Sequence, residues 1–146
     1  MAKFSGELGL QFVTHLANHY SLRDLMRLAQ LGADSGFCQI WLNDNIRYRN
    51  QMVVLTAIAS QVPIRLGTAI MVPYFHNPLD MADSFGALSE LCEGREISIG
   101  IARGDLGQSP QHVQAQKPIA MVSETTRLLR RALSGEEFPY SDYPFL

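Results

Sequence analysis

The chain has 146 residues, of which 47% are hydrophobic and 18% are charged, and its formal net charge is −2. These values are typical of one globular domain and exclude a disordered or fibrous protein, and the 12 lysines and arginines form no basic stripe, so we expect no nucleic-acid partner. No apolar run approaches the roughly 20 residues that span a bilayer, and the N-terminus lacks a secretion signal, so we expect a cytoplasmic protein with no membrane partner.

The first part of the chain predicts a strand followed by a helix. Residues 7–13 form a short apolar stretch, which favours a strand. Ser21 and Asp24, three positions apart, match the pattern of a capping box, so a helix is expected to begin there. Gly36 can adopt the left-handed conformation that closes a helix, and we expect this helix to end at that residue.

The same pattern then repeats twice, with a polar loop (residues 43–49) after the second strand and a loop rich in proline and aromatic residues (72–77) after the third. Residues 38–42 form a nearly all-apolar strand, and a helix is predicted from about residue 50 to residue 61, where Pro63 stops it. Residues 64–71 form the third strand. Pro78 then takes the favoured first position of the next helix.

A fourth unit completes the pattern. Residues 97–102 predict a strand, residues 103–117 a long polar loop, and residues 118–134 a helix that Gly135 ends. The last segment, residues 136–146, is rich in proline and aromatic residues but has no periodicity. We therefore predict an extended segment or loop there, without a helix of its own.

Four such units in succession predict an α/β fold, because a crossover helix is the usual way to place parallel strands side by side. Periodicity leaves open a doubly wound sheet and half of an eightfold barrel. The spacing of Gly100, Gly104 and Gly107 does not match a dinucleotide-binding turn. In a barrel, the residues that follow the strands share one C-terminal rim, where barrel active sites lie. The polar and glycine residues after the four strands are His15, His19, Asp44, Asn45, His76, Asn77, Arg103, Gly104 and Asp105.

Four segments carry a resemblance to a known family. They are residues 36–44 (GFCQIWLND), residues 64–72 (IRLGTAIMV), Asn77-Pro78 followed by residues 88–95 (LSELCEGR), and residues 99–104 (IGIARG). In this order and spacing they resemble the bacterial luciferase-like, flavin-dependent family. The family includes bacterial luciferase, alkanesulfonate monooxygenase and the deazaflavin-dependent methylenetetrahydromethanopterin reductases.

The resemblance implies that residues 1–146 are a single domain, the N-terminal half of a TIM (β/α)8 barrel that stops before the fifth strand. It implies the N-terminal part of a reduced-flavin monooxygenase or deazaflavin-dependent reductase acting on a small organic substrate, inactive on its own, with FMN or deazaflavin at the rim. Open sheet edges would then favour a homo-oligomer or a second half-barrel chain. The alternative is a non-catalytic half barrel that dimerises and serves as a binding or regulatory module.

The resemblance also implies which residues contact the cofactor. Thr68, Ala69 and Ile70, at the end of the third strand, would lie against the flavin ring, and relatives often have a non-proline cis peptide at the position of Ala69-Ile70. The alternative is a simple buried strand end. The other expected contacts are Ala102, Arg103 and Gly104, since a cation near the flavin could balance negative charge. The alternative for Arg103 is a surface ion pair with Asp105.

Asp44 and Asn45 are the expected catalytic residues by resemblance, because many relatives have an acidic residue followed by histidine there. An amide cannot act as a general base near neutral pH, so Asn45 puts a mechanism relying on that base in doubt. His15 or His76 could substitute, the alternative being a solvated loop histidine. Asn77 is expected to cap a helix.

Cysteine and aromatic positions complete the sequence-based expectations. Cys38 and Cys92 do not have the spacing of zinc ligands, so we expect no metal site and two free, buried thiols. Phe37 and Trp41 are expected to fill the core rather than contact a cofactor.

Overall fold

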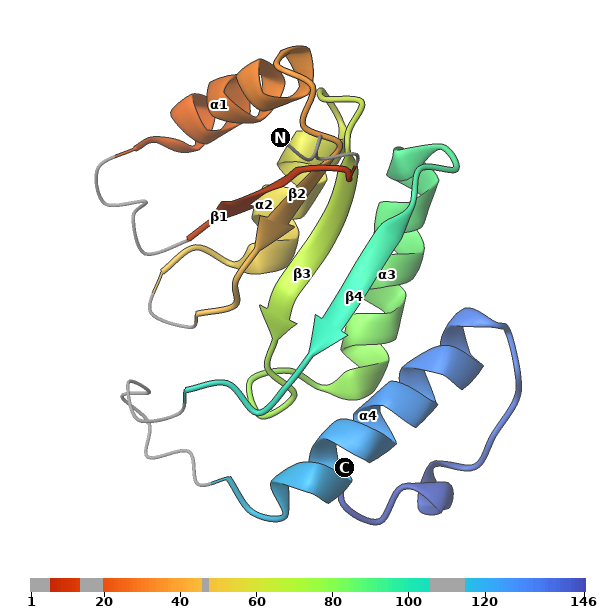
Figure 1. Cartoon of the computed structure of the whole chain (residues 1–146). Coiled ribbons are helices and arrows are strands. Elements are labelled where there is room, and N and C mark those ends of the chain that lie inside the picture. The colour runs from red at the N-terminus through yellow and green to blue at the C-terminus, as the bar shows by residue number, and fades with distance from the viewer. Residues whose placement is uncertain (1–5, 14–19, 46–47, 106–114) are drawn as a thin grey trace.

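A computed structural model describes residues 6–13, 20–45, 48–105 and 115–146 of the chain (Figure 1). Four strands alternate with four helices in the described ranges, which confirms the predicted α/β class. The elements are β1 (Gly9–Phe12), α1 (Leu22–Asp34), β2 (Gln39–Leu42), α2 (Gln51–Ala59), β3 (Arg65–Met71), α3 (Pro78–Cys92), β4 (Ile97–Ile101), α4 (Pro118–Leu133) and the short 3-10 helix η3 (Tyr140–Asp142). None of the described helices is long and apolar enough to cross a membrane.

The strands form one parallel sheet in the order β1-β2-β3-β4, so spatial order follows chain order. Gly9 pairs with Gln39, and Gln39 pairs with Arg65 on the next strand. A doubly wound sheet reverses its strand order at a switch point and carries helices on both faces. Neither feature is present in the described sheet, whose helices lie on one face (Figure 1). This arrangement is that of consecutive units in a barrel wall.

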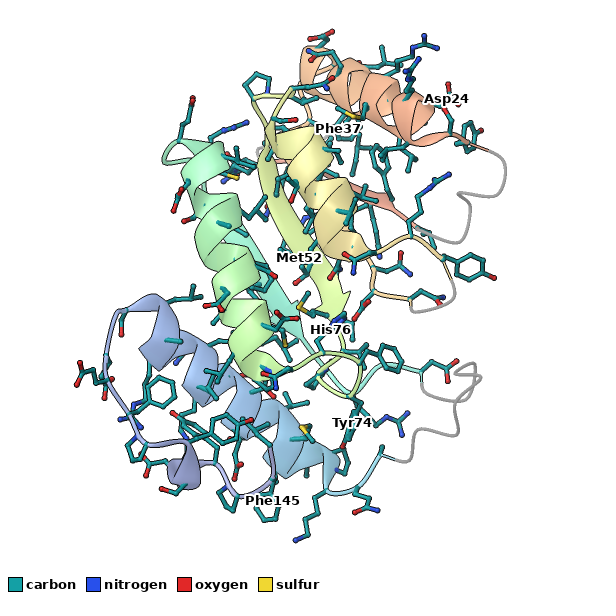
Figure 2. The ribbon with its side chains drawn as sticks, turned by 180° about the vertical axis from the view of Figure 1, so that it is seen from behind. Asp24, Phe37, Met52, Tyr74, His76 and Phe145 are labelled. Atoms are coloured by element: carbon teal, nitrogen blue, oxygen red, sulfur yellow. The ribbon has the colours of Figure 1, made fainter. Side chains whose placement is uncertain are left out.

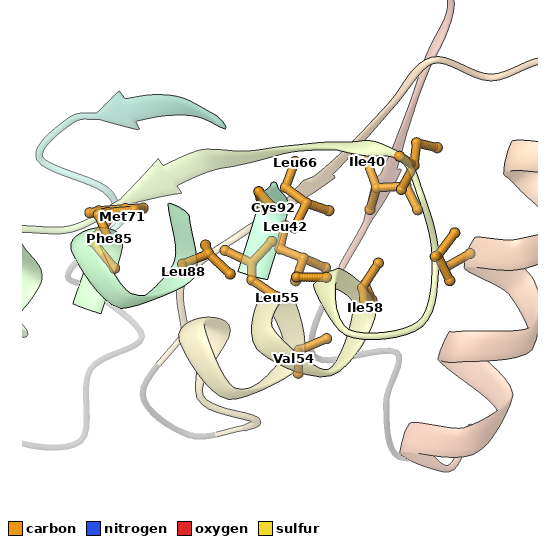
Figure 3. Close-up of a cluster of buried hydrophobic side chains, with 14 of the residues drawn as sticks. Ile40, Leu42, Val54, Leu55, Ile58, Leu66, Met71, Phe85, Leu88 and Cys92 are labelled. Carbon is orange, nitrogen blue, oxygen red and sulfur yellow. The ribbon is translucent and has the colours of Figure 1, made fainter. Parts of the chain in front are cut away.

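The hydrophobic core lies between the sheet and the helices (Figure 3). Ile40, Leu42 and Leu66 are fully buried on the strand side. From the helices, Leu55 and Phe85 pack against them within the same cluster of buried residues. Since successive strand residues point to opposite faces, these buried positions define the face that the helices cover.

The opposite face of the sheet carries polar side chains and one large ring. Gln39 Nε2 donates hydrogen bonds to Leu66 O (3.2 Å) and Ser98 Oγ (2.9 Å). Arg65 forms ion pairs with Glu7 and Glu96 on neighbouring segments. These contacts tie the strands together through side chains, in addition to the backbone ladder.

Trp41 departs from the expectation that it fills the helix-covered core. It alternates with Ile40 and Leu42, so its indole lies on the opposite face and is half-buried there. Added β-carbons at Gly9 and Gly67 would come within 3.0 Å and 2.5 Å of the ring. The two glycines therefore provide the space that the indole occupies. Phe37 follows α1 and, like Trp41, is half-buried (Figure 2).

The predicted helix boundaries are confirmed where local chemistry sets them. Ser21 Oγ accepts from Asp24 N (3.1 Å) while Asp24 Oδ2 accepts from Ser21 N (2.9 Å), which is the expected capping box. Asn77 Oδ1 accepts from Leu79 N (2.9 Å) and caps α3 as expected. Gly36 has φ +87° after α1.

The segment after α4 differs from the prediction of an extended or loop segment without a helix. It contains η3 and folds back along α4 (Figure 1). Tyr143 is only 1% exposed, and Phe145 N donates to Glu124 Oε2 on α4 (2.9 Å). Arg131 lies over the Phe138 ring at 4.9 Å. Long-range packing on α4, which periodicity does not register, fixes this segment.

The two cysteines are both free, as predicted, but only one is fully buried. Cys92 has no exposed surface and lies in the core. Cys38 is half-buried, and its thiol donates to Leu8 O (3.1 Å). The expectation of two buried thiols is therefore correct for Cys92 alone. Cys38 lies directly before the N-terminal end of β2, outside the core.

Candidate functional site

The candidate site lies at the C-terminal rim of the sheet, where β2, β3 and β4 end (Figure 1). Three hydrogen bonds join the segments that follow these strands, two between backbone groups and one from a backbone amide to the Asp44 side chain. Asp44 N donates to Ile70 O (3.0 Å), and Ala102 N donates to Met71 O (3.3 Å). Val72 N donates to Asp44 Oδ2 (3.0 Å). The structure thus brings together Asp44, Ile70 and Ala102 from three different parts of the sequence.

The end of β3 contains the cis peptide bond Ala69–Ile70, as the resemblance implied. The pairing of β3 with β4 shifts there, because Thr68 pairs with Ile99 while Met71 pairs with Ile101. One residue of β3 is therefore extra relative to β4. Ala69 and Ile70 are both half-buried, so each residue keeps part of its surface exposed.

Thr68 lies one residue before this bond and is fully buried. Its hydroxyl donates to Gly100 O (2.9 Å) and accepts from Gly100 N (2.9 Å). A β-carbon at Gly100 would come within 2.4 Å of Thr68 O, so a larger residue does not fit. Thr68 thus joins β3 to β4, and its contact with a cofactor stays a prediction.

The Asp44 carboxyl is also buried, with only 4% of its side chain exposed. Its Oδ2 atom lies 2.7 Å from His76 Nε2 and also accepts the hydrogen bond from Val72 N. His76 keeps 21% of its side chain exposed and lies beside the end of β3 (Figure 2). The pair therefore links the exits of two neighbouring strands. The alternative of His76 as a solvated loop histidine is wrong.

Two glutamines at this end of the sheet were not predicted from the sequence. Gln51, at the start of α2, is 1% exposed, and its Nε2 donates to Leu42 O (2.7 Å) and Ile70 O (3.4 Å). Gln11 Nε2 donates to Ala69 O (3.2 Å) from β1. A signal was available for Gln51, since it is a polar residue at helical spacing from the apolar Val54, Leu55 and Ile58.

These contacts fix the backbone around Ala69–Ile70 from three sides. The oxygen of Ala69 accepts from Gln11, and the oxygen of Ile70 accepts from the Asp44 backbone and the Gln51 side chain. Each donor comes from a different segment of the chain. The two successive peptide oxygens are consequently held in one orientation, which a binding surface requires.

Arg103 and Gly104 follow β4 on the other side of the rim. Arg103 is exposed, and its Nε donates to Gly104 O (3.2 Å). Gly104 has φ +71°, and a β-carbon there would come within 2.5 Å of Val72 Cγ2. Gly104 therefore lies close to Val72, the first residue after β3. Asp105 takes part in an interaction of its own.

Tyr74 connects the loops after β3 and β4. Its hydroxyl donates to Gln116 O (2.7 Å), just before α4 begins. Burial raises the pKa of Tyr74, and the positive charge of Arg103 opposes that shift. The charge of Arg103 therefore acts on the loop after β3, in which Tyr74 lies (Figure 2).

The remaining residues predicted for the site are Asn45, His15 and His19. Asn45 is half-buried beside Asp44, and its carbonyl accepts from Tyr48 N (3.2 Å). His15 and His19 lie outside the described residues. Neither a role for Asn45 in catalysis nor a role for Arg103 in cofactor binding is tested by these contacts, and both stay predictions.

The sequence matches a known family over nearly its whole length. The family model of luciferase-like monooxygenases matches residues 8–143. A 5,10-methylenetetrahydromethanopterin reductase of Methanolobus tindarius is 30% identical over 111 residues, which are 75% of this chain and 34% of that protein. The chain thus spans about a third of the length of this curated relative.

Longer proteins of known structure share the fold. The coenzyme F420-dependent tetrahydromethanopterin reductase of Methanopyrus kandleri has a TM-score of 0.72 at 22% identity, over 86% of this chain and 39% of that chain. The oxygenating constituent of 3,6-diketocamphane monooxygenase from Pseudomonas putida, in complex with FMN, has a TM-score of 0.73 at 20% identity, over 90% of this chain and 41% of that chain. The likeness shows the fold alone, and it confirms the predicted class: parallel βα units that form a partial TIM barrel.

Proposed function

Since the chain belongs to the luciferase-like monooxygenase family, we propose that it is the N-terminal part of an oxidoreductase that uses FMN or a deazaflavin on a small organic substrate. The names of its relatives support both cofactors, because one is an F420-dependent reductase and another is a monooxygenase in complex with FMN. The single observation that carries the proposal is the half-buried segment Ala69–Ile70, whose backbone is held by hydrogen bonds from neighbouring segments.

The described residues fit one part of such a cofactor. A flavin or deazaflavin ring is flat and needs an apolar surface of fixed shape, which Ala69 and Ile70 offer at the rim. Arg103, exposed on the adjacent strand exit, supplies a positive charge for an anionic group. Ala102 and Gly104 flank that arginine. Thr68 contributes by holding β3 against β4 at this point.

In this proposal the protein positions the reactants, and the bound cofactor supplies hydride transfer or oxygen activation. Asp44 and Asn45 lie on the β2 side of the rim, where the Asn45 side chain would orient the substrate. Asp44 is committed to Val72 and His76, so its part is to hold the rim in shape. Asn45 offers an amide that can donate and accept hydrogen bonds but cannot take a proton near neutral pH.

The same proposal covers organisation and assembly. We treat residues 1–146 as one luciferase-like half-barrel domain in the cytoplasm, without nucleic-acid or membrane partners. Its uncovered sheet face and the edges of β1 and β4 would be covered by another copy or by a second half-barrel chain. Sedimentation of the 146-residue chain should give more than one copy per particle. A monomer at all concentrations would remove the homo-oligomer from the proposal.

The cofactor proposal is tested by titration of the 146-residue chain with FMN and, separately, with coenzyme F420. We expect a saturable change in visible absorption with one of them. Arg103→Ala should weaken this binding about tenfold, the equivalent of about 1.4 kcal/mol, whereas Arg130→Ala, an exposed position on α4, should not. No change with either cofactor would overturn the proposal and favour the non-catalytic binding or regulatory module.

A further inference from the structure

His76 stands out at the rim because a buried carboxylate holds one of its ring nitrogens. Asp44 Oδ2 lies 2.7 Å from His76 Nε2, and the Asp44 side chain is only 4% exposed. The ring itself keeps 21% of its side-chain surface exposed, beside the end of β3 (Figure 2). A histidine that a buried carboxylate holds and that keeps some exposed surface differs from a loop histidine that turns freely in water.

The contacts of Asp44 determine which ring nitrogen carries the hydrogen. Val72 N donates to the same oxygen, Oδ2, from 3.0 Å. An ionised carboxylate only accepts hydrogen bonds, so the ring nitrogen that faces it must donate. Nε2 therefore carries the hydrogen, and in the neutral ring Nδ1 is left with its lone pair. Carboxylates select histidine tautomers in this way in many protein sites.

His76 is connected to the strand end that is proposed to face the cofactor. Asp44 contacts His76 through its side chain and Ile70 through its backbone, at 3.0 Å. One residue thus connects the histidine to the strand end proposed to face the cofactor. Asn45 cannot accept a proton, and His76 is the only histidine within the described ranges.

We propose that His76 is the proton-transfer residue of this rim, with Nδ1 as the atom that takes and returns the proton and Asp44 as the positioning residue that holds the ring. This inference rests on the proposed function. As an anionic ligand binds at the rim, an O–H or N–H bond of hydronium or of a buffer acid breaks, its electron pair stays on the oxygen or nitrogen, and the proton bonds to Nδ1. The ring becomes an imidazolium whose charge Asp44 balances, and the proton later leaves to water.

The tautomer is tested first, without any cofactor. The chain has four histidines, and comparison with His76→Gln identifies the His76 signals in the imidazole nitrogen NMR spectrum of the labelled chain. We expect Nε2 to be protonated and Nδ1 to be unprotonated in the neutral ring. Asp44→Asn should abolish this preference, because an amide can donate as well as accept. A protonated Nδ1, or an equal mixture of the two tautomers in the unsubstituted chain, would overturn the inference.

Proton transfer is tested with the cofactors themselves. Binding of FMN or coenzyme F420, both anionic, is measured by calorimetry in buffers of different ionisation heat, which gives the number of protons taken up. We expect uptake by the unsubstituted chain and none by His76→Gln. The glutamine amide can still donate to Asp44, so a purely structural role for His76 predicts no difference between the two.

The outcomes separate this inference from the proposed function. Equal proton uptake by both proteins, with intact cofactor binding, would overturn the role of His76 and leave the cofactor proposal standing. Binding of neither FMN nor coenzyme F420 would overturn both. Loss of binding in His76→Gln with an unchanged melting temperature would assign the ring to cofactor contact in place of proton transfer, and would also overturn the inference.

Discussion

The indole of Trp41 lies against the α-carbon of Gly67 on the neighbouring strand, where an added β-carbon would come within 2.5 Å of Cε3. Gly9 on the other side leaves similar room, since its added β-carbon would lie 3.0 Å from Nε1. One aromatic ring therefore occupies the space above two glycines. On the face of the sheet that the helices do not cover, the Trp41 ring therefore fits the space left by the two glycines, in addition to the polar contacts of that face.

Gly67→Ala should consequently destabilise the chain by about 1–3 kcal/mol, the usual cost of overpacking a site whose surroundings cannot move freely. Urea denaturation measures this difference. The matched control is Gly86→Ala in α3, where nothing lies within 4 Å of the added carbon. That change should be neutral or slightly stabilising, because alanine favours helix. Equal effects of both substitutions would contradict the packing of Trp41.

Gln51→Glu should destabilise the chain by about 3 kcal/mol, because it places a carboxylate against the oxygens of Leu42 and Ile70 in a buried position. The favourable position of a negative charge at the start of α2 offsets at most about 1 kcal/mol. Chemical denaturation gives the value. Gln61→Glu, an exposed change of the same kind, should stay within about 0.5 kcal/mol of the unsubstituted chain. If the two variants are equally stable, Gln51 does not fix the strand ends.

The two thiols should react at different rates in the folded chain. Burial raises the pKa of Cys92, which lowers the amount of reactive thiolate, and its side chain has no exposed surface. Cys38 is half-buried and accessible. Alkylation with iodoacetamide, followed by mass spectrometry, should modify Cys38 first and Cys92 only after unfolding. Cys38→Ser should remove the fast reaction, and modification of Cys92 in the folded Cys38→Ser chain would contradict the structure.

The capping box of α1 should make part of the stability depend on acid pH. Hydrogen bonds from Ser21 lower the pKa of Asp24 below its ordinary value of 3.8. The stabilisation is therefore fully present above about pH 4 and is lost as the pH falls through the lowered pKa.

Ser21→Ala should cost about 1 kcal/mol at pH 7, and the difference in stability between the unsubstituted chain and Asp24→Ala should shrink below pH 4. Denaturation at pH 7 and pH 3 tests both statements. Asp83→Ala, at an exposed position of α3, serves as the control for general acid effects. A difference for Asp24→Ala that does not change with pH would contradict the box.

The fold could be predicted where its causes are local. Ser21 and Asp24 predict the start of α1, because a capping box joins residues that are three positions apart. Asn77 and Pro78 predict the start of α3, as a helix cap followed by the favoured first residue. The cis bond at Ala69–Ile70 came from the resemblance to a family, since nothing in the composition of residues 64–71 indicates it.

The contacts of the site were harder to predict, because they join distant segments. Gln51 reaches Leu42 O across 9 residues and Ile70 O across 19 residues, so the contact depends on the register of strands that a single sequence does not reveal. The pairing of Asp44 with His76 spans 32 residues. Tyr143 in the last segment is buried for a related reason, since Arg127 of α4 lies over its ring at 5.2 Å, while Phe138 packs against the ring from within the segment.

The strand order β1-β2-β3-β4 also bears on how the molecule is made. Each strand pairs with the one synthesised just before it, so no pairing has to wait for a distant part of the chain. Such nearest-neighbour connections keep the loop that each pairing must close shorter than in a sheet that skips strands, which lowers the entropy cost of closing it. Because the N-terminal end of a chain is synthesised first, each strand leaves the ribosome after the strand with which it pairs. At every stage the sheet has two open edges, one at β1 and one at the strand added last, which is β4 in the described sheet.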